Sequence, residues 1–183
     1  MGKGKTDFVR LFIFVLMITC ILVTSAMLSE NQVDASSKPT KKKINKVVST
    51  AKKMKGKSIR SFPSYFNSGK WCADFVYWTT KKSKVANNKV YPKSKKNVSG
   101  LIKWYKNKKQ YRKNTKKFTP NKGDLVFLSS SSHVGIVDKV SKKHVYIIHG
   151  NWSNRVKYTK LNRFGYTRSQ SAKIKGYADV NFG

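Results

Sequence analysis

The chain has 183 residues, and 40 Lys and Arg against seven Asp and Glu give it a formal charge of +33. This length allows one ordinary domain, or two small ones. The 4 Trp, 9 Tyr and 10 Phe supply a hydrophobic core, so wholesale disorder is not expected, and two cysteines cannot build a disulfide framework.

The first 35 residues are predicted to be a targeting segment rather than part of the fold. Basic residues at positions 3, 5 and 10 precede a predominantly apolar run over residues 11–28, and Val33-Asp34-Ala35 offers compact side chains for a signal peptidase. The alternative is an uncleaved membrane anchor through residues 11–28, because a run of this length just spans a bilayer. In both cases the remainder is expected outside the cytoplasm, either secreted or associated with the cell wall.

Residues 36–183 contain 37 Lys and Arg but only four acidic residues, which are Asp74, Asp124, Asp138 and Asp179. Glycoside hydrolysis needs two carboxylates that flank a sugar, and a calcium site needs several that cluster. Three His and one Cys at no zinc-finger spacing do not indicate a zinc site. The sequence therefore predicts neither a metal site nor a cofactor.

Helices are predicted for the first half of the exported part. After a basic linker over residues 36–43, apolar residues at positions 44, 47, 48, 51 and 54 indicate an amphipathic helix that Gly56 ends. A loop over 58–70 leads to the apolar stretch Trp71–Thr80, which reads as a buried helix, and Val98–Tyr105 indicates a further short helix.

The second half changes to the pattern of strands and tight turns. Strands are expected at residues 125–128, 133–140, 144–149, 156–161 and 174–180, with Gly150-Asn151 ending the third. Helices followed by an antiparallel meander predict an α+β fold in a single domain over residues 44–183.

Cys72 is the one cysteine in the exported part, since Cys20 falls in the apolar run. In the first turn of a helix, unpaired backbone N–H groups and the helix dipole favour a thiolate, which is the setting of a nucleophile. The alternative interpretation is a small buried hydrophobic residue. Its place between Trp71 and Asp74 in an exported chain favours the nucleophile.

A thiol nucleophile needs a base, and His133 opens a strand directly after a serine-rich turn. If residues 133–140 and 144–151 form a hairpin around Lys142-Lys143, residue 133 lies near residue 149 or 151. His149 and Asn151 are therefore both candidates to orient His133. His144 lies at the opposite, turn end of the hairpin and is predicted to have no catalytic role.

The order of WCADFVYW, GDLVFL, HVGIV and a strand that ends in HGN resembles the CHAP family of cysteine, histidine-dependent amidohydrolases/peptidases. The similarity runs from about Ile44 to Tyr177. It implies a papain-like fold with helices packed on an antiparallel sheet, and hydrolysis of amide bonds in peptidoglycan. It implies Cys72 as nucleophile, His133 as base and Asn151 as the polar residue of the family's Glu-Gly-Asn signature. His149 stands where many members of the family have Glu. NlpC-type relatives commonly use a third histidine as the group that orients the base, so His149 and Asn151 both stay candidates for orienting His133.

The expected function is that of a secreted peptidoglycan hydrolase, either an N-acetylmuramoyl-L-alanine amidase or a peptide endopeptidase. Lys outnumbers Arg by 32 to 5 after residue 35, which suits diffuse attraction to an anionic wall polymer such as a teichoic acid. The high Lys and Asn usage favours a Gram-positive source. The alternatives are a catalytically weak cationic protein that binds walls or acts as an antimicrobial, and, less favoured, nucleic-acid binding through residues 103–113 or membrane action through residues 44–54.

Overall fold

The computed structural model describes residues 40–66, 69–128, 132–165 and 173–183. The predicted targeting segment and residues 36–39 of the predicted linker lie outside these ranges. Residues 40–43 of the predicted linker are helical, because lysine is a good helix former, and Lys43 Nζ donates to the Phe182 carbonyl oxygen at 2.9 Å. No helix in the described ranges is long and apolar enough to cross a membrane.

The helices follow the predicted apolar pattern. A helix over residues 40–52 buries Val47, Val48 and Ala51, and the turn after it reaches Gly56 at φ +83°, a backbone conformation that suits glycine. A short 3₁₀ helix η1 (Ile59–Ser61) lies in the following loop. Helix α2 (Cys72–Lys82) and helix α3 (Val98–Asn107) confirm two predictions to within two residues at each end.

The described strands form one antiparallel sheet in the order β1-β6-β2-β3-β4-β5. The predicted strands are confirmed as β2 (Leu125–Leu128), β3 (His133–Val140), β4 (His144–Trp152), β5 (Arg155–Asn162) and β6 (Ile174–Ala178), and the sequence missed the short β1 (Tyr111–Lys113). β2 to β5 form the expected meander, while β6 pairs with β2 and β1. The α+β fold class is thus confirmed.

One strand is longer than predicted, because Gly150-Asn151 does not end β4. The strand continues to Trp152 with a shift in its register against β5 between His149 and Trp152. Asn151 has φ +59° at this irregularity. A bulge lets the strand bend and re-aims its side chains without ending the pairing.

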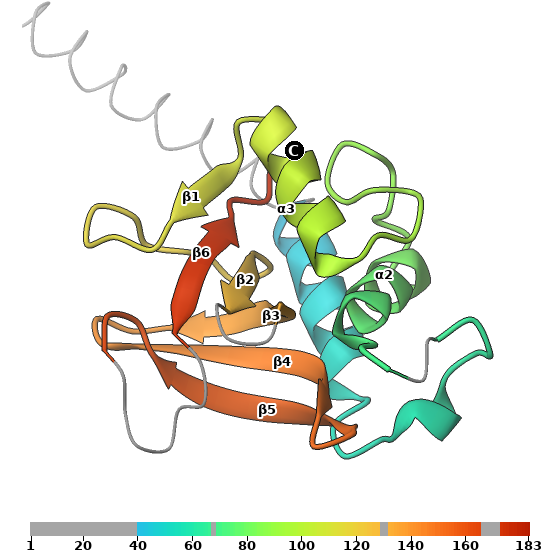
Figure 1. The fold of residues 1–183 in the computed structure, drawn as a ribbon. Coiled ribbons are helices and arrows are strands. Elements are labelled where there is room, and N and C mark those ends of the chain that lie inside the picture. Colours follow the sequence, from blue (N-terminus) through green and yellow to red (C-terminus); the bar gives the residue numbers. More distant parts are fainter. Residues whose placement is uncertain (1–39, 67–68, 129–131, 166–172) are drawn as a thin grey trace, which may run out of the picture. The chain divides into compact units, whose positions relative to one another are not determined.

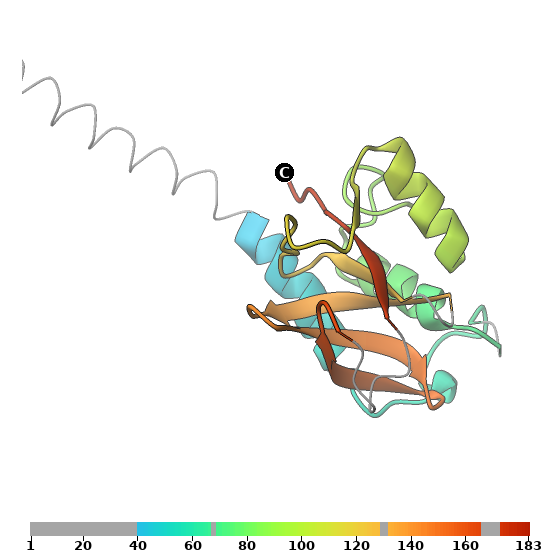
Figure 2. The ribbon, with the colours of Figure 1, turned by 60° about the vertical axis from the view of Figure 1, so that its left-hand side comes forward.

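Alternate residues of the sheet pack on opposite faces. Leu125 and Phe127 belong to the larger core, which the helices cover, and Val126 and Leu128 belong to a smaller apolar cluster on the other face. In Figure 1 the helix of residues 40–52 and α2 lie against the strands, and α2 contacts β3 and β4. Figure 2 shows α3 beside β1 and β6, away from the β4–β5 hairpin. This arrangement brings the first residue of α2 to the β3–β4 hairpin.

Candidate active site

The start of α2 packs very closely against β4. A Cβ atom on Gly150 would lie 2.5 Å from Trp71 Cζ3 and 2.6 Å from Phe75 Cβ, so this contact requires glycine. Trp71 Nε1 also donates to Asn154 Oδ1 at 3.3 Å, in the turn between β4 and β5. These contacts fix the helix position from which Cys72 projects.

Cys72 is buried at the first position of α2, with 2 % of its surface exposed. Its thiol donates to the Ser132 carbonyl oxygen, with an Sγ–O distance of 3.9 Å. Ser132 directly precedes His133, which opens β3. The fold therefore brings together the predicted nucleophile and the predicted base, which are 61 positions apart in the chain.

His133 and His149 are hydrogen-bonded to each other, with 2.8 Å between His133 Nε2 and His149 Nδ1. The prediction that the far ends of the β3–β4 hairpin meet is confirmed. Gly135 leaves the room for this pair, because a Cβ atom there would lie 3.1 Å from His149 Cβ. Both rings are buried, at 5 % and 0 % exposure.

The hydrogen-bonded chain continues beyond the two histidines. His149 Nε2 lies 2.8 Å from Thr159 Oγ1 on β5. Two proton arrangements satisfy this chain, and in one of them each histidine carries its proton on Nε2. In that arrangement His133 Nδ1 holds a free lone pair with which it can accept a proton.

Burial makes both imidazoles neutral at pH 7. It lowers the pKa of His133 from 6.5 to about 4. It lowers the pKa of His149 to about 3, and the electrostatic interactions of His149 with His133 and with Lys157 act in the same direction. Both imidazoles therefore rest uncharged, and in the arrangement with both protons on Nε2, His133 Nδ1 is the nitrogen of the pair with a free lone pair.

The expectation of a thiolate at Cys72 is wrong. Burial raises the pKa of the Cys72 thiol, while the backbone N–H groups of Val134, Ala73 and Cys72 itself lower it, and the Asp74 carboxylate adds to the rise. The helix start acts in the predicted direction, but desolvation outweighs it. The resting state is thus a neutral thiol beside a neutral imidazole.

Asn151, the second candidate for orienting His133, makes its hydrogen bond elsewhere. Its Nδ2 donates to the Gly69 carbonyl oxygen at 2.9 Å. This bond ties the end of β4 to the segment that leads into α2. The hydrogen bond to His133 Nε2 is made by His149.

Two residues at the site were missed by the sequence analysis. The Trp152 ring centroid lies 5.4 Å from that of His133 and 4.8 Å from that of His149, so its indole packs against both imidazoles. Thr159 is the other. Trp152 was missed because the strand was thought to end before it. A β4–β5 hairpin register would have brought Thr159 near His149, since Thr159 pairs with Ile147.

A cavity of about 310 Å³ opens beside Cys72, and Ala73 and Ser132 are among its lining residues. Lys95 Nζ forms an ion pair with Asp74 Oδ1 at 3.0 Å on its wall. The cavity thus borders the chain neighbours of Cys72 and His133, and it is the candidate place for a substrate. In the residues that the structure describes, no group of three His, Cys, Asp or Glu could hold a metal ion.

Comparison with known proteins gives one finding. Residues 64–151 match the family model of the CHAP domain. This range includes Cys72, His133, His149 and Asn151 and is shorter than the similarity that the sequence analysis predicted. Neither a curated protein nor a solved structure matches the chain.

Proposed function

The chain belongs to the CHAP domain family through residues 64–151, a family of hydrolases of the peptidoglycan amidase and peptidase type, and we propose that it cleaves its substrate by cysteine catalysis. In this proposal Cys72 is the nucleophile, His133 the general base and His149 the residue that orients His133. The observation that carries it is the hydrogen bond of 2.8 Å between the two histidines, next to a buried thiol. The substrate is peptidoglycan, and the scissile bond is an amide.

The neutral resting state defines the first step. As Cys72 Sγ attacks the scissile carbonyl carbon, the thiol proton passes to His133 Nδ1, because His133 Nε2 is already bound to His149. The imidazolium then gives this proton to the leaving nitrogen, the C–N bond breaks and a thioester remains. Water attacks the thioester with His133 again as base, which releases a carboxylic acid and restores the thiol.

Burial disfavours the imidazolium of His133, and two neighbours partly offset this cost in the proposed mechanism. His149 Nδ1 accepts from His133 Nε2–H and so fixes the tautomer that leaves Nδ1 free. The Trp152 ring, 5.4 Å from the His133 ring, can stabilise a transient positive charge. The backbone N–H groups of Cys72 and Ala73, which lower the pKa of the thiol, are the candidate donors to the oxyanion.

The test is digestion of purified peptidoglycan by the full chain, with released fragments identified by mass spectrometry. We expect Cys72→Ser and treatment with iodoacetamide to abolish release, and Cys20→Ser, the matched control at the other cysteine, to leave it unchanged. Release by a folded Cys72→Ser protein at the wild-type rate would contradict cysteine catalysis. New termini at the muramoyl lactyl group indicate an amidase, and new termini within the peptide indicate an endopeptidase.

A second candidate function is a catalytically weak cationic protein that binds cell walls. Two observations favour it. The pKa of the Cys72 thiol is raised, and the hydrogen-bond partner of His133 is the uncharged His149 rather than a carboxylate. This function predicts no release of fragments and no alkylation of Cys72 by iodoacetamide. Either fragment release or rapid alkylation would count against it.

Export is part of the proposal and has its own test. We propose that the protein reaches the wall or the medium, with residues 1–35 cleaved or, as the alternative, with residues 11–28 kept as an anchor. N-terminal sequencing of the protein recovered from wall and medium fractions distinguishes the two. A mature chain that begins at Ser36 supports cleavage, and an intact chain in the membrane fraction supports the anchor.

A further inference from the structure

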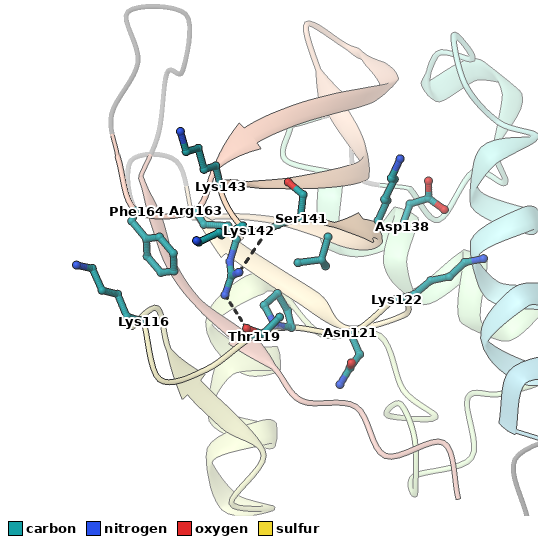
Figure 3. Close-up of a pocket in the computed structure, with 13 residues that line it drawn as sticks. Lys116, Thr119, Asn121, Lys122, Asp138, Ser141, Lys142, Lys143, Arg163 and Phe164 are labelled. Carbon is teal, nitrogen blue, oxygen red and sulfur yellow. Dashed lines mark hydrogen bonds between the residues drawn. The ribbon is translucent and has the colours of Figure 1, made fainter.

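A second and larger cavity lies at the turn end of the β3–β4 hairpin, at the far end of β3 from His133. Its volume is about 940 Å³. Six cationic side chains line it: Lys116, Lys122, Lys139, Lys142, Lys143 and Arg163. We call this cavity the basic pocket. Figure 3 shows Lys116, Lys142 and Lys143 around Arg163 and Phe164 at one end of it, and Lys122 and Asp138 at the other.

The one carboxylate of the basic pocket is already neutralised. Asp138 Oδ2 lies 2.8 Å from Lys52 Nζ and accepts from the Tyr158 hydroxyl at 2.6 Å. Lys122 Nζ donates to Asn45 Oδ1, and Lys139 Nζ lies over the Tyr146 ring. The remaining positive charge of the pocket is therefore not balanced by the carboxylate in its wall.

Three lysines are free to meet a ligand. Lys116, Lys142 and Lys143 are exposed, and the ion pairs found in the described ranges join other residues. They come from two separate segments, the stretch that leads to β2 and the β3–β4 turn. Charges presented from two sides of one cavity suit an extended anion that touches both.

A buried arginine holds the wall of the basic pocket in place through several hydrogen bonds. Arg163 is 5 % exposed, and its guanidinium donates to the Phe118 carbonyl oxygen at 2.9 Å. It also donates to Thr119 Oγ1 at 3.1 Å and to the Ser141 carbonyl oxygen at 3.4 Å, as Figure 3 shows. These bonds hold the two lysine-bearing segments to one centre. A buried guanidinium also keeps a strong positive potential in the pocket, because little water screens it.

We propose that the basic pocket binds phosphodiester groups of an anionic polymer whose repeat unit is a polyol or sugar rather than a nucleoside. Lysine ammonium groups act as point charges that suit single phosphates and do not need bidentate geometry. A nucleic acid would also use aromatic rings for base stacking. The aromatic side chain in the described lining is Phe164, and one face of its ring is covered by the Arg163 guanidinium at 4.8 Å.

The position of the basic pocket allows both sites to act together. His133 opens β3, and Asp138, five residues further along the strand, is the first residue of β3 that lines the basic pocket, which at about 3.3 Å per residue corresponds to roughly 17 Å. A bound wall polymer such as a teichoic acid would hold the protein while the cavity beside Cys72 stays open to peptidoglycan. This consequence rests on the proposed function, whereas binding to the basic pocket does not.

The test measures binding of a purified poly(glycerol phosphate) chain to the full chain carrying Cys72→Ala, by calorimetry at physiological ionic strength. The triple variant Lys116→Gln, Lys142→Gln, Lys143→Gln is compared with the control Lys53→Gln, Lys57→Gln, Lys103→Gln. The control removes the same charge from exposed lysines outside the basic pocket. We expect at least about ten-fold weaker binding for the first variant and less than about three-fold for the second.

Three outcomes would overturn the proposal. Equal weakening by the two variants would mean that the attraction is diffuse and that no site exists. Tighter binding of single-stranded DNA of equal charge, lost in the same pocket variant, would identify a nucleic-acid site. Tighter binding to phosphatidylglycerol vesicles, or full displacement by millimolar inorganic phosphate, would identify a lipid headgroup or a free ion as the ligand. Because the protein carries Cys72→Ala, none of these results depends on hydrolysis.

Discussion

The two ends of the β3–β4 hairpin place similar basic residues in opposite environments. At one end His133 and His149 are buried beneath Trp152, and burial lowers the pKa of these imidazoles to about 4 and about 3. At the other end Lys142 and Lys143 are exposed on the rim of the basic pocket. At one end two buried imidazoles rest neutral and are candidates for proton transfer, and at the other exposed ammonium groups are available to attract an anion, so residue type and burial together separate the two chemistries.

Apolar packing separates the two ends. Val137, Val145 and Ile147 are fully buried between them on one face of the sheet. The exposed lysines are also screened by salt over a Debye length of about 8 Å at physiological ionic strength, which is shorter than β3. Changes at one end are therefore expected to leave the other end almost unaffected, and the following predictions test this independence.

The largest effect is expected for His133→Ala. Without the base the thiol keeps its proton, and kcat/KM for peptidoglycan fragments should fall by about 10³-fold. Binding of poly(glycerol phosphate) should not change. A folded His133→Ala protein that keeps more than a tenth of the wild-type kcat/KM would contradict the role of His133 as base.

The next effect is expected for His149, which in the proposed mechanism acts on the reaction through His133. His149→Ala should lower kcat/KM by about 10²-fold, because His133 loses the acceptor that fixes its tautomer. His149→Gln keeps an acceptor and should lose less. Thermal unfolding of both variants separates this effect from loss of the fold, and equal losses for Ala and Gln would argue against orientation by a hydrogen bond.

The pH dependence of kcat/KM should reflect the buried base. The pKa of His133 is lowered to about 4, so the base is deprotonated above pH 4 and activity falls only as the pH drops through about 4. At pH 5 such a base is about 90 % active, whereas an exposed histidine of pKa 6.5 would be about 3 % active, a difference of about thirty-fold.

The Trp152→Ala variant tests whether burial sets the pH dependence of kcat/KM. The substitution admits water to both imidazoles. The pH at which kcat/KM falls on the acidic side, the acidic limb of the pH profile, should therefore rise from about 4 towards 6.5. A limb near 6.5 in the wild-type protein, or no shift in the Trp152→Ala protein, would show that burial does not set the protonation of His133.

The sequence predicted the part of the candidate site's geometry that depends on order along the chain. Cys72 at a helix start and His133 at a strand start were predicted from local patterns, and the β3–β4 turn brought residue 133 near residue 149. The choice between His149 and Asn151 was not accessible, because it depends on the bulge at Gly150-Asn151 that redirects one side chain to Gly69. Local patterns do not report which of two neighbouring polar groups faces inward at a bulge.

Burial was the other property that the sequence did not provide. A helix N-terminus predicts a low pKa for the Cys72 thiol, but Cys72 is buried in the fold and this burial raises that pKa. The short strand β1 was missed because Tyr111–Lys113 has no alternating apolar pattern and pairs only with β6. The basic pocket depends on the distant Arg163 joining two segments, which composition alone shows only as diffuse charge.

A smaller effect is expected for Thr159, a positioning residue for His149. Thr159→Val removes a hydrogen bond of 2.8 Å to His149 Nε2, which should lower kcat by about three- to ten-fold with KM unchanged. Thr159→Ser keeps the hydroxyl and should restore kcat. If the Val and Ser variants are equally impaired, packing rather than the hydrogen bond accounts for the effect.

The smallest effect is expected from the double variant Lys142→Gln, Lys143→Gln, which changes the β3–β4 turn and leaves the histidine end of the hairpin untouched. On a small soluble muropeptide, which reaches the cavity beside Cys72 without engaging the basic pocket, kcat/KM should change by less than about two-fold, and the acidic limb should stay near pH 4. On intact walls the same variant should lose activity as it loses retention, and added salt should remove the difference between variant and wild type. A shifted limb on the soluble substrate would show that the lysines act on His133 through the protein, and the two ends of the hairpin would then be one coupled site.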